Sequence, residues 1–142
     1  MISGDGMQHN LREKVSLIIK ERNLCSFMNN TKWNELISAI TEEMPFPPPF
    51  DIKYLTEEDC FPNELLNGDV YHLGDWKGEN FPSEEYYFNI EWIKVRPRHL
   101  EHRGTLIKPE IIDESKLFEA ILNRYHIHYE ERNGSYYIYG YH

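Results

Sequence analysis

The alternation of apolar and polar positions predicts three amphipathic helices. Apolar residues at helical spacing indicate a helix over residues 10–22, and a second stripe from Trp33 indicates a helix that begins after Asn30 or Thr31. A third stripe, from Leu117, predicts a helix that opens at 113–115, where acidic residues favour the positive end of a helix. Each helix should bury one face.

The longest run of aromatic and β-branched residues, 86–95, predicts the central strand of a sheet. Because side chains alternate along a strand, Phe88, Ile90 and Trp92 should share the core face. Glu91 then lies on the opposite face, which is expected to be half-exposed or to line a groove. Further strands are predicted at 50–56 and 69–76, and a short helical turn at 63–68. After Pro97 we expect a polar, basic loop with one short extended piece at 105–107.

A hairpin is predicted near the C-terminus, because Asn133-Gly134 stands between two alternating segments, 127–132 and 135–140. A two-residue turn sets the register, so that Tyr129 faces Ile138 and Glu130 faces Tyr137. The core side of the hairpin should carry Ile127, Tyr129, Tyr136 and Ile138. The outer side should carry His126, His128, Glu130, Tyr137, Tyr139 and Tyr141.

These elements predict an α+β fold in the order α-α-β-β-β-α-β-β. Its largely antiparallel sheet of about five strands should have helices on one face. Residues 28–142 should form a single domain, and residues 1–27 a helical extension packed on it. The residues expected to be most buried are Leu117, Phe118, Ile121, Phe88, Ile90, Trp92, Trp33, Ile37 and Ile138.

Composition narrows the class of protein. The chain of 142 residues has no apolar run near the roughly 20 residues that a membrane helix needs, and its first residues lack the pattern of a signal peptide. Its two cysteines, Cys25 and Cys60, lack metal-type spacing, which favours a reduced, cytoplasmic protein. No glycine-rich phosphate loop or nucleophile elbow occurs, so no cofactor is expected.

Charge argues against nucleic acid as a partner, because the chain carries a net −9 and phosphate binding needs a basic surface. The charge is uneven. Residues 94–108 carry +4, so the rest of the chain carries −13. Either a basic loop balances an acidic body, which is the commoner arrangement, or the acidic side steers a basic partner.

Histidines and one glutamate are the candidates for chemistry. His99 and His102 are three residues apart but lack a third ligand, so no metal is expected there. His126 and His128 share a strand face with Glu130, which suits a ligand set or a general base, although ordinary cross-strand pairing is favoured. Glu91 sits in the most apolar strand, so with His128 it is the acid–base pair of an alternative reading as a small enzyme. Pairing of Glu91 with a nearby lysine or arginine is the plainer interpretation.

Three motifs carry a family resemblance: Asn29-Asn30-Thr31-Lys32-Trp33, Ile90-Glu91-Trp92-Ile93 and Tyr137-Ile138-Tyr139-Gly140-Tyr141. Together they resemble a group of short bacterial proteins of unknown function, over about residues 28–142. The resemblance implies a bacterial origin and assigns no catalytic residues.

These features favour a non-catalytic protein-binding module, comparable to immunity proteins that block a basic toxin. The acidic body would speed encounter with a basic partner, and tyrosine supplies interface area at low entropic cost. The predicted binding residues are Tyr137, Tyr139, Tyr141, Glu130 and His128. A homodimer through the edge of the C-terminal hairpin, at strand 136–141, is the rival. Neither nucleic acid nor membrane is an expected partner.

Overall fold

The computed structural model describes residues 4–57 and 68–142, with side chains from residue 9 onward. Its elements in chain order are α1 (Gly4–Arg22), α2 (Asn30–Glu43), β1 (Phe50–Tyr54), the 3-10 helix η2 (Glu84–Asn89), β2 (Ile90–Val95), β3 (Arg98–Glu101), β4 (Glu110–Asp113), α3 (Ser115–Arg124), β5 (Tyr129–Arg132) and β6 (Ser135–Tyr139). The predicted α+β class is confirmed. The predicted turn at 63–68 and the interpretation of Cys60 concern a stretch that lies outside the described residues.

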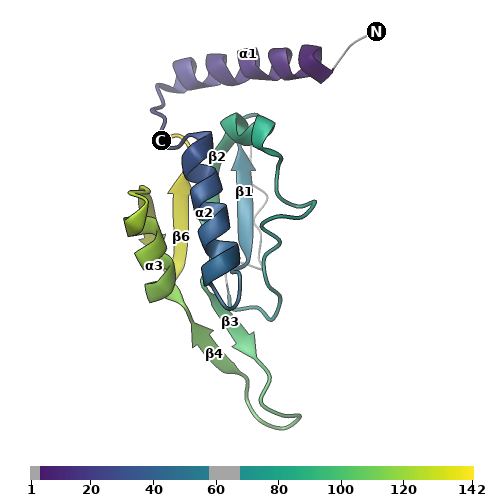
Figure 1. Cartoon of the computed structure of the whole chain (residues 1–142), viewed down its shortest axis with the longest axis vertical. Coiled ribbons are helices and arrows are strands. Elements are labelled where there is room, and N and C mark those ends of the chain that lie inside the picture. Colours follow the sequence, from purple (N-terminus) through teal and green to yellow (C-terminus); the bar gives the residue numbers. More distant parts are fainter. Residues whose placement is uncertain (1–3, 58–67) are drawn as a thin grey trace.

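Four strands form an antiparallel sheet in the order β1-β2-β6-β5, and β3 and β4 form a separate two-stranded sheet. Helices α2 and α3 cover one face of the four-stranded sheet, whereas α1 crosses its end (Figure 1). The predicted central position of β2 is therefore confirmed. The hairpin register is also confirmed, with Tyr129 opposite Ile138 and Glu130 opposite Tyr137.

The core lies between the sheet and the two helices. Ile52, Ile93 and Ile138 stand side by side on neighbouring strands and point toward the helices. Helix α3 contributes Phe118 and Ile121, and α2 contributes the stripe that begins at Trp33. Of the residues expected to be most buried, the structure buries Trp33, Ile37, Ile90, Phe118, Ile121 and Ile138.

The predicted core face of the central strand is wrong at Phe88 and Trp92, which are only half-buried. Residues 84–89 form a 3-10 helix, so the strand starts at Ile90. A bulge then shifts the alternation, because Lys53 pairs with Trp92 and Tyr54 with Ile90, which leaves Glu91 without a partner on β1. Ile90, Ile93 and Val95 consequently face the helices.

The middle of the chain departs further from the prediction. Residues 69–76 form no strand; Val70 makes one isolated bridge, and Trp76 buries its ring while its indole N–H donates to the Pro48 carbonyl at 2.8 Å. The proline-rich connector is thus part of the packed core. The stretch after Pro97 is the β3–β4 hairpin, and the predicted extended piece at 105–107 lies in its loop. Leu117 is half-buried against the core.

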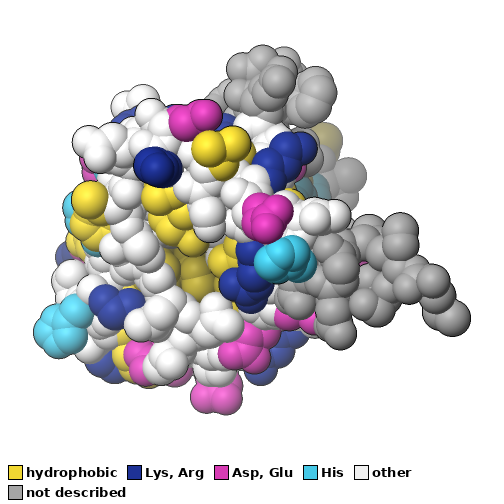
Figure 2. Space-filling model, turned by 90° about the horizontal axis from the view of Figure 1, so that it is seen from above, with side chains coloured by type: hydrophobic (Ala, Val, Ile, Leu, Met, Phe, Trp, Pro, Cys, Tyr) yellow, Lys and Arg dark blue, Asp and Glu magenta, His cyan; other side chains and the backbone are white. Residues whose placement is uncertain are grey.

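Helix α1 crosses the end of the four-stranded sheet and contacts the 3-10 helix η2 there (Figure 1). Val15 is buried, and the guanidinium of Arg12 lies 4.1 Å from the centre of the Phe88 ring in η2. Seen from the α1 end, hydrophobic side chains gather in a hollow with Lys or Arg side chains beside it (Figure 2). The predicted boundary between an extension and a domain stays a prediction.

The segment after α1 joins the C-terminal end of the chain. Cys25 and His142 exchange two backbone hydrogen bonds at 3.0 Å, and the N–H of Phe27 donates to the Gly140 carbonyl at 2.9 Å. Residues 25–27 thus extend the pairing beyond β6. Helix α2 follows directly, and its N-cap is Asn29, whose side chain accepts from the N–H of Lys32 at 2.8 Å. The cap was predicted one or two residues later.

Gly140 stands where two backbones approach closely. A Cβ added there would lie 2.2 Å from the Ile90 carbonyl oxygen, so the backbone would have to move. We therefore expect Gly140→Ala to lower the free energy of unfolding by about 1–3 kcal/mol in urea melts. Gly68→Ala is the control, because nothing lies within 4 Å of a Cβ added there. Equal stabilities for the two variants would contradict the close approach at Gly140.

Candidate functional site

Glu91 is the centre of a buried ion cluster at the bulge in β2. Its carboxylate accepts hydrogen bonds from Arg22 at 2.6 Å and from Lys53 at 2.9 Å, and its side chain is only 10% exposed. Burial alone would raise the pKa of Glu91, but the two cations outweigh it and hold the pKa below its usual value. A carboxylate held in its ionised form by two cations is a weak proton acceptor, so the cluster suits anchoring of α1 better than acid–base chemistry.

His128 lies in a different cluster, so the structure does not bring Glu91 and His128 together. Its ring stacks on Phe27, with centroids 4.6 Å apart, and lies 6.1 Å from Tyr139 and 6.4 Å from His142. These contacts fasten the residues after α1 to the start of the hairpin. His126 is exposed and has a positive φ of 55°.

Glu130 and Tyr139 meet on the outer face of the hairpin. The hydroxyl of Tyr139 donates to Glu130 at 3.1 Å, and Arg132 donates to the same carboxylate at 2.6 Å. Tyr139 is buried, which raises the pKa of its phenol. Arg132 and Tyr139 together hold the pKa of Glu130 below its usual value.

Tyr137 and Tyr141, the other predicted binding residues, are half-buried. Tyr141 donates its hydroxyl to the Phe88 carbonyl at 2.8 Å, and burial raises the pKa of its phenol. Tyr137 packs edge-on against Trp92 with ring centroids 5.3 Å apart. The ammonium of Lys94 and the guanidinium of Arg132 lie 5.7 Å and 4.8 Å from its ring centre. Among the predicted binding residues, Tyr139 is buried, His128 is exposed, and Glu130, Tyr137 and Tyr141 are partly accessible.

The basic segment 94–108 is partly neutralised inside the fold. Arg96 and Arg98 each bond to a different oxygen of Asp69, at 3.0 and 3.1 Å. Arg96 also donates to the Asn133 carbonyl at the hairpin turn. This part of the basic segment ties three regions of the chain together. Asp69 was not singled out from the sequence, because nothing local marks it as an arginine partner.

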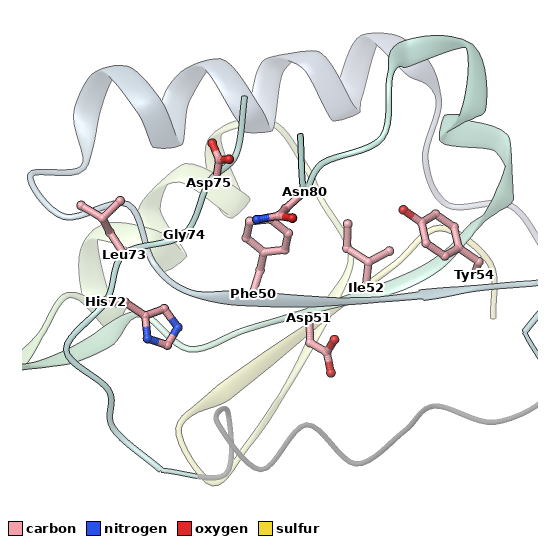
Figure 3. Close-up of a pocket in the computed structure, with 9 residues that line it drawn as sticks. All are labelled: Phe50, Asp51, Ile52, Tyr54, His72, Leu73, Gly74, Asp75 and Asn80. Carbon is pink, nitrogen blue, oxygen red and sulfur yellow. The ribbon is translucent and has the colours of Figure 1, made fainter. Parts of the chain in front are cut away.

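A pocket of about 370 Å³ runs along β1, on the side of the strand away from β2. We call it the β1-edge pocket. Phe50, Ile52 and Tyr54 point into it from the same side of the strand, and Asn80 lies over the Phe50 ring, whereas the carboxylate of Asp75 points away from the strand (Figure 3). The remaining lining residues are Asp51, His72, Leu73 and Gly74.

The edge of β1 also directs backbone groups toward this pocket. Phe50 pairs with Val95, and the N–H of Arg96 donates to the Pro49 carbonyl at 3.2 Å. In an antiparallel ladder this pattern turns the N–H and C=O of Phe50 and Ile52 away from β2. The pocket thus combines strand-edge backbone, apolar side chains and two carboxylates, and none of the described residues that line it is a lysine or arginine.

Comparison with known proteins identifies a family without assigning an activity. The profile of the family of unknown function DUF6678 matches residues 15–142, so the chain belongs to this family. The matched range begins inside α1. No curated protein and no solved structure shows a significant match. Within the part of the chain that the structure describes, no helix is long and apolar enough to cross a bilayer.

Proposed function

We propose that this member of the DUF6678 family is a non-catalytic protein-binding module, and that it holds an extended, basic segment of another protein along the outer edge of β1. The observation that carries the proposal is the β1-edge pocket, where carboxylates and apolar side chains accompany a strand edge. Extended peptides commonly bind by adding a strand to such an edge, with backbone hydrogen bonds supplying affinity and side-chain pockets supplying specificity.

Charge selects the partner. Asp51 and Asp75 line the pocket and place negative charge beside the strand edge. The chain outside residues 94–108 carries −13, so a positive segment is attracted from a distance as well as on contact. Such complementarity acts mainly on the rate of encounter and on specificity.

The hairpin surface provides a second area of contact in this proposal. His128, Glu130 and Tyr137 keep accessible atoms on the outer side of the hairpin. The rival homodimer would have to use β5, because β6 lies between β2 and β5 and is not an edge. The prediction that strand 136–141 is an uncovered edge is therefore wrong.

The test uses a labelled seven-residue peptide of alternating lysine and valine, with the glutamate–valine peptide as its matched control. Fluorescence anisotropy should show binding of the lysine peptide that weakens as salt rises, because screening shortens the reach of the carboxylates. Asp75→Asn should weaken binding about two- to fivefold, the typical effect of one partly exposed charge. Glu79→Gln is the control outside the pocket lining and should leave the affinity unchanged.

Two outcomes would contradict the proposal. One is equal binding of the lysine and glutamate peptides. The other is binding of the lysine peptide that survives N-methylation of alternate residues, because the methyl groups block hydrogen bonding to a strand edge. Tyr137→Ala tests the second contact area separately, and it should leave binding of this short peptide unchanged.

A further inference from the structure

A second cavity, of about 520 Å³, lies between the proline-rich connector and the β3–β4 hairpin. None of the described residues lines both the β1-edge pocket and this cavity. Its volume falls in the range that suits small-molecule ligands. Its lining includes Phe46, Tyr71, His99, Glu101, His102 and Glu114.

Two stacked pairs of rings supply the aromatic part of the lining. His99 stacks on Phe46 with ring centroids 3.6 Å apart and planes 8° from parallel. His102 stacks on Tyr71 at 4.3 Å and 11°. His99 is buried, whereas Tyr71 and His102 are exposed. Rings stacked in this way offer flat contact area to a planar ligand.

Glu114 provides the polar feature of the cavity. Its carboxyl accepts a hydrogen bond from the backbone N–H of Phe46, while Oε2 is buried and has no hydrogen-bond partner. Burial raises the pKa of Glu114, although nearby His99 opposes this shift. An unpaired buried oxygen is unfavourable, so a ligand donor that reached it would gain affinity from the hydrogen bond.

The charge of the lining favours a cation. Within the part of the chain that the structure describes, Glu101 and Glu114 are the acidic members of the lining, and no lysine or arginine belongs to it. A metal ion is not favoured, because the described residues hold no group of three histidine, cysteine or acidic side chains arranged to bind one. An organic cation with its own N–H donors could contact the aromatic rings and also donate a hydrogen bond to the unpaired oxygen of Glu114.

We propose that this cavity binds a small planar aromatic cation, such as an aromatic amidine or a protonated heteroaromatic amine. The ring of the ligand lies among the four aromatic side chains, and its charged nitrogen donates to Glu114. The site does not depend on the proposed protein-binding function. Asp75→Asn should leave it unaffected, and a Glu114 variant should still bind the lysine–valine peptide.

Three probes of nearly the same shape test the proposal: benzamidine, which is cationic, benzamide, which is neutral, and benzoate, which is anionic. Isothermal titration with the full chain should show benzamidine binding at least tenfold more tightly than the other two. Glu114→Gln keeps the size of the side chain and removes its charge, so it should weaken benzamidine binding about tenfold. Glu110→Gln is the matched control, because Glu110 is exposed on β4 and is not part of the lining.

A thermal melt shows whether Glu114→Gln is folded. The substitution removes a buried carboxylate that is incompletely paired, so its melting temperature should equal or exceed that of the wild type. The proposal is overturned if benzoate binds as tightly as benzamidine, or if Glu114→Gln binds benzamidine with unchanged affinity. Absence of benzamidine binding at about 1 mM also overturns it.

Discussion

Ile93→Ala is expected to lower the free energy of unfolding by about 2–5 kcal/mol, the range for truncating a large aliphatic side chain in a packed core. Ile93 is fully buried between Ile52 and Ile138. Trp92→Ala, one position earlier, is expected to cost only about 1–2 kcal/mol, although the tryptophan side chain is larger. The reason is that Trp92 is half-buried on the outer face, where it contacts Tyr137.

Urea melts of the two variants give the comparison directly. A larger loss for Trp92→Ala than for Ile93→Ala would contradict a bulge at Glu91. It would mean that β2 presents Trp92, and not Ile93, to the helices. Tyr137→Ala serves as a further check, because it removes the ring that covers Trp92 and should have an effect closer to that of Trp92→Ala.

Glu91→Ala is expected to destabilise the protein by about 3–5 kcal/mol, because it leaves the mostly buried ammonium of Lys53 without a counter-ion. Lys53 is 13% exposed, so water compensates it poorly. Arg22→Ala should cost much less, because the Arg22 side chain is 46% exposed and Lys53 still satisfies the carboxylate. Chemical denaturation at neutral pH measures both variants.

The same cluster predicts how stability depends on pH. The folded state holds the pKa of Glu91 below its ordinary value of 4.5, so the contribution of Glu91 is fully present above that value. It is lost as the pH falls from 4.5 through the lowered pKa. Glu91→Gln should therefore lose less stability than the wild type over this acid range. Parallel stability profiles for the two proteins would contradict the role given to the ion cluster.

The parts of the fold that follow from local patterns could be predicted from the sequence. Helix α3 shows its stripe within ten residues, and the hairpin is set by Asn133 and Gly134, whose φ values of 52° and 82° are those such a turn needs. Both depend on neighbours in the chain. Their register and buried faces could therefore be inferred without knowing the rest of the molecule.

The errors arise where distant segments decide the outcome. In β2 the alternation of buried and exposed side chains is interrupted at Glu91, because the backbone carbonyl of Glu91 accepts hydrogen bonds from the N–H groups of Gly140 and Tyr141. These two residues are far from Glu91 in the sequence. Residues 69–76 resemble a strand but are fixed by Trp76 and Gly74 to the proline-rich connector.

The candidate sites, too, are formed by segments that are distant in the sequence and could not be predicted from local patterns. The acidic residues before α3 predicted a favourable helix end, and the carboxylate of Asp113 does accept from the N–H of Ser115 at 2.8 Å. Glu114, one residue later, instead lines the second cavity. The β1-edge pocket joins Asp75 to β1 through a loop whose path has no local signal.

The pairing of Cys25 and Phe27 with the last residues of the chain has a kinetic consequence. It joins segments separated by almost the whole sequence, and closing so long a loop is entropically costly until the sheet between them exists. Helix α1 should consequently dock late in folding and open early, as a unit separate from the sheet. Amide hydrogens of residues 10–27 should exchange with solvent through this partial opening, well before those of β2 and β6, which await global unfolding.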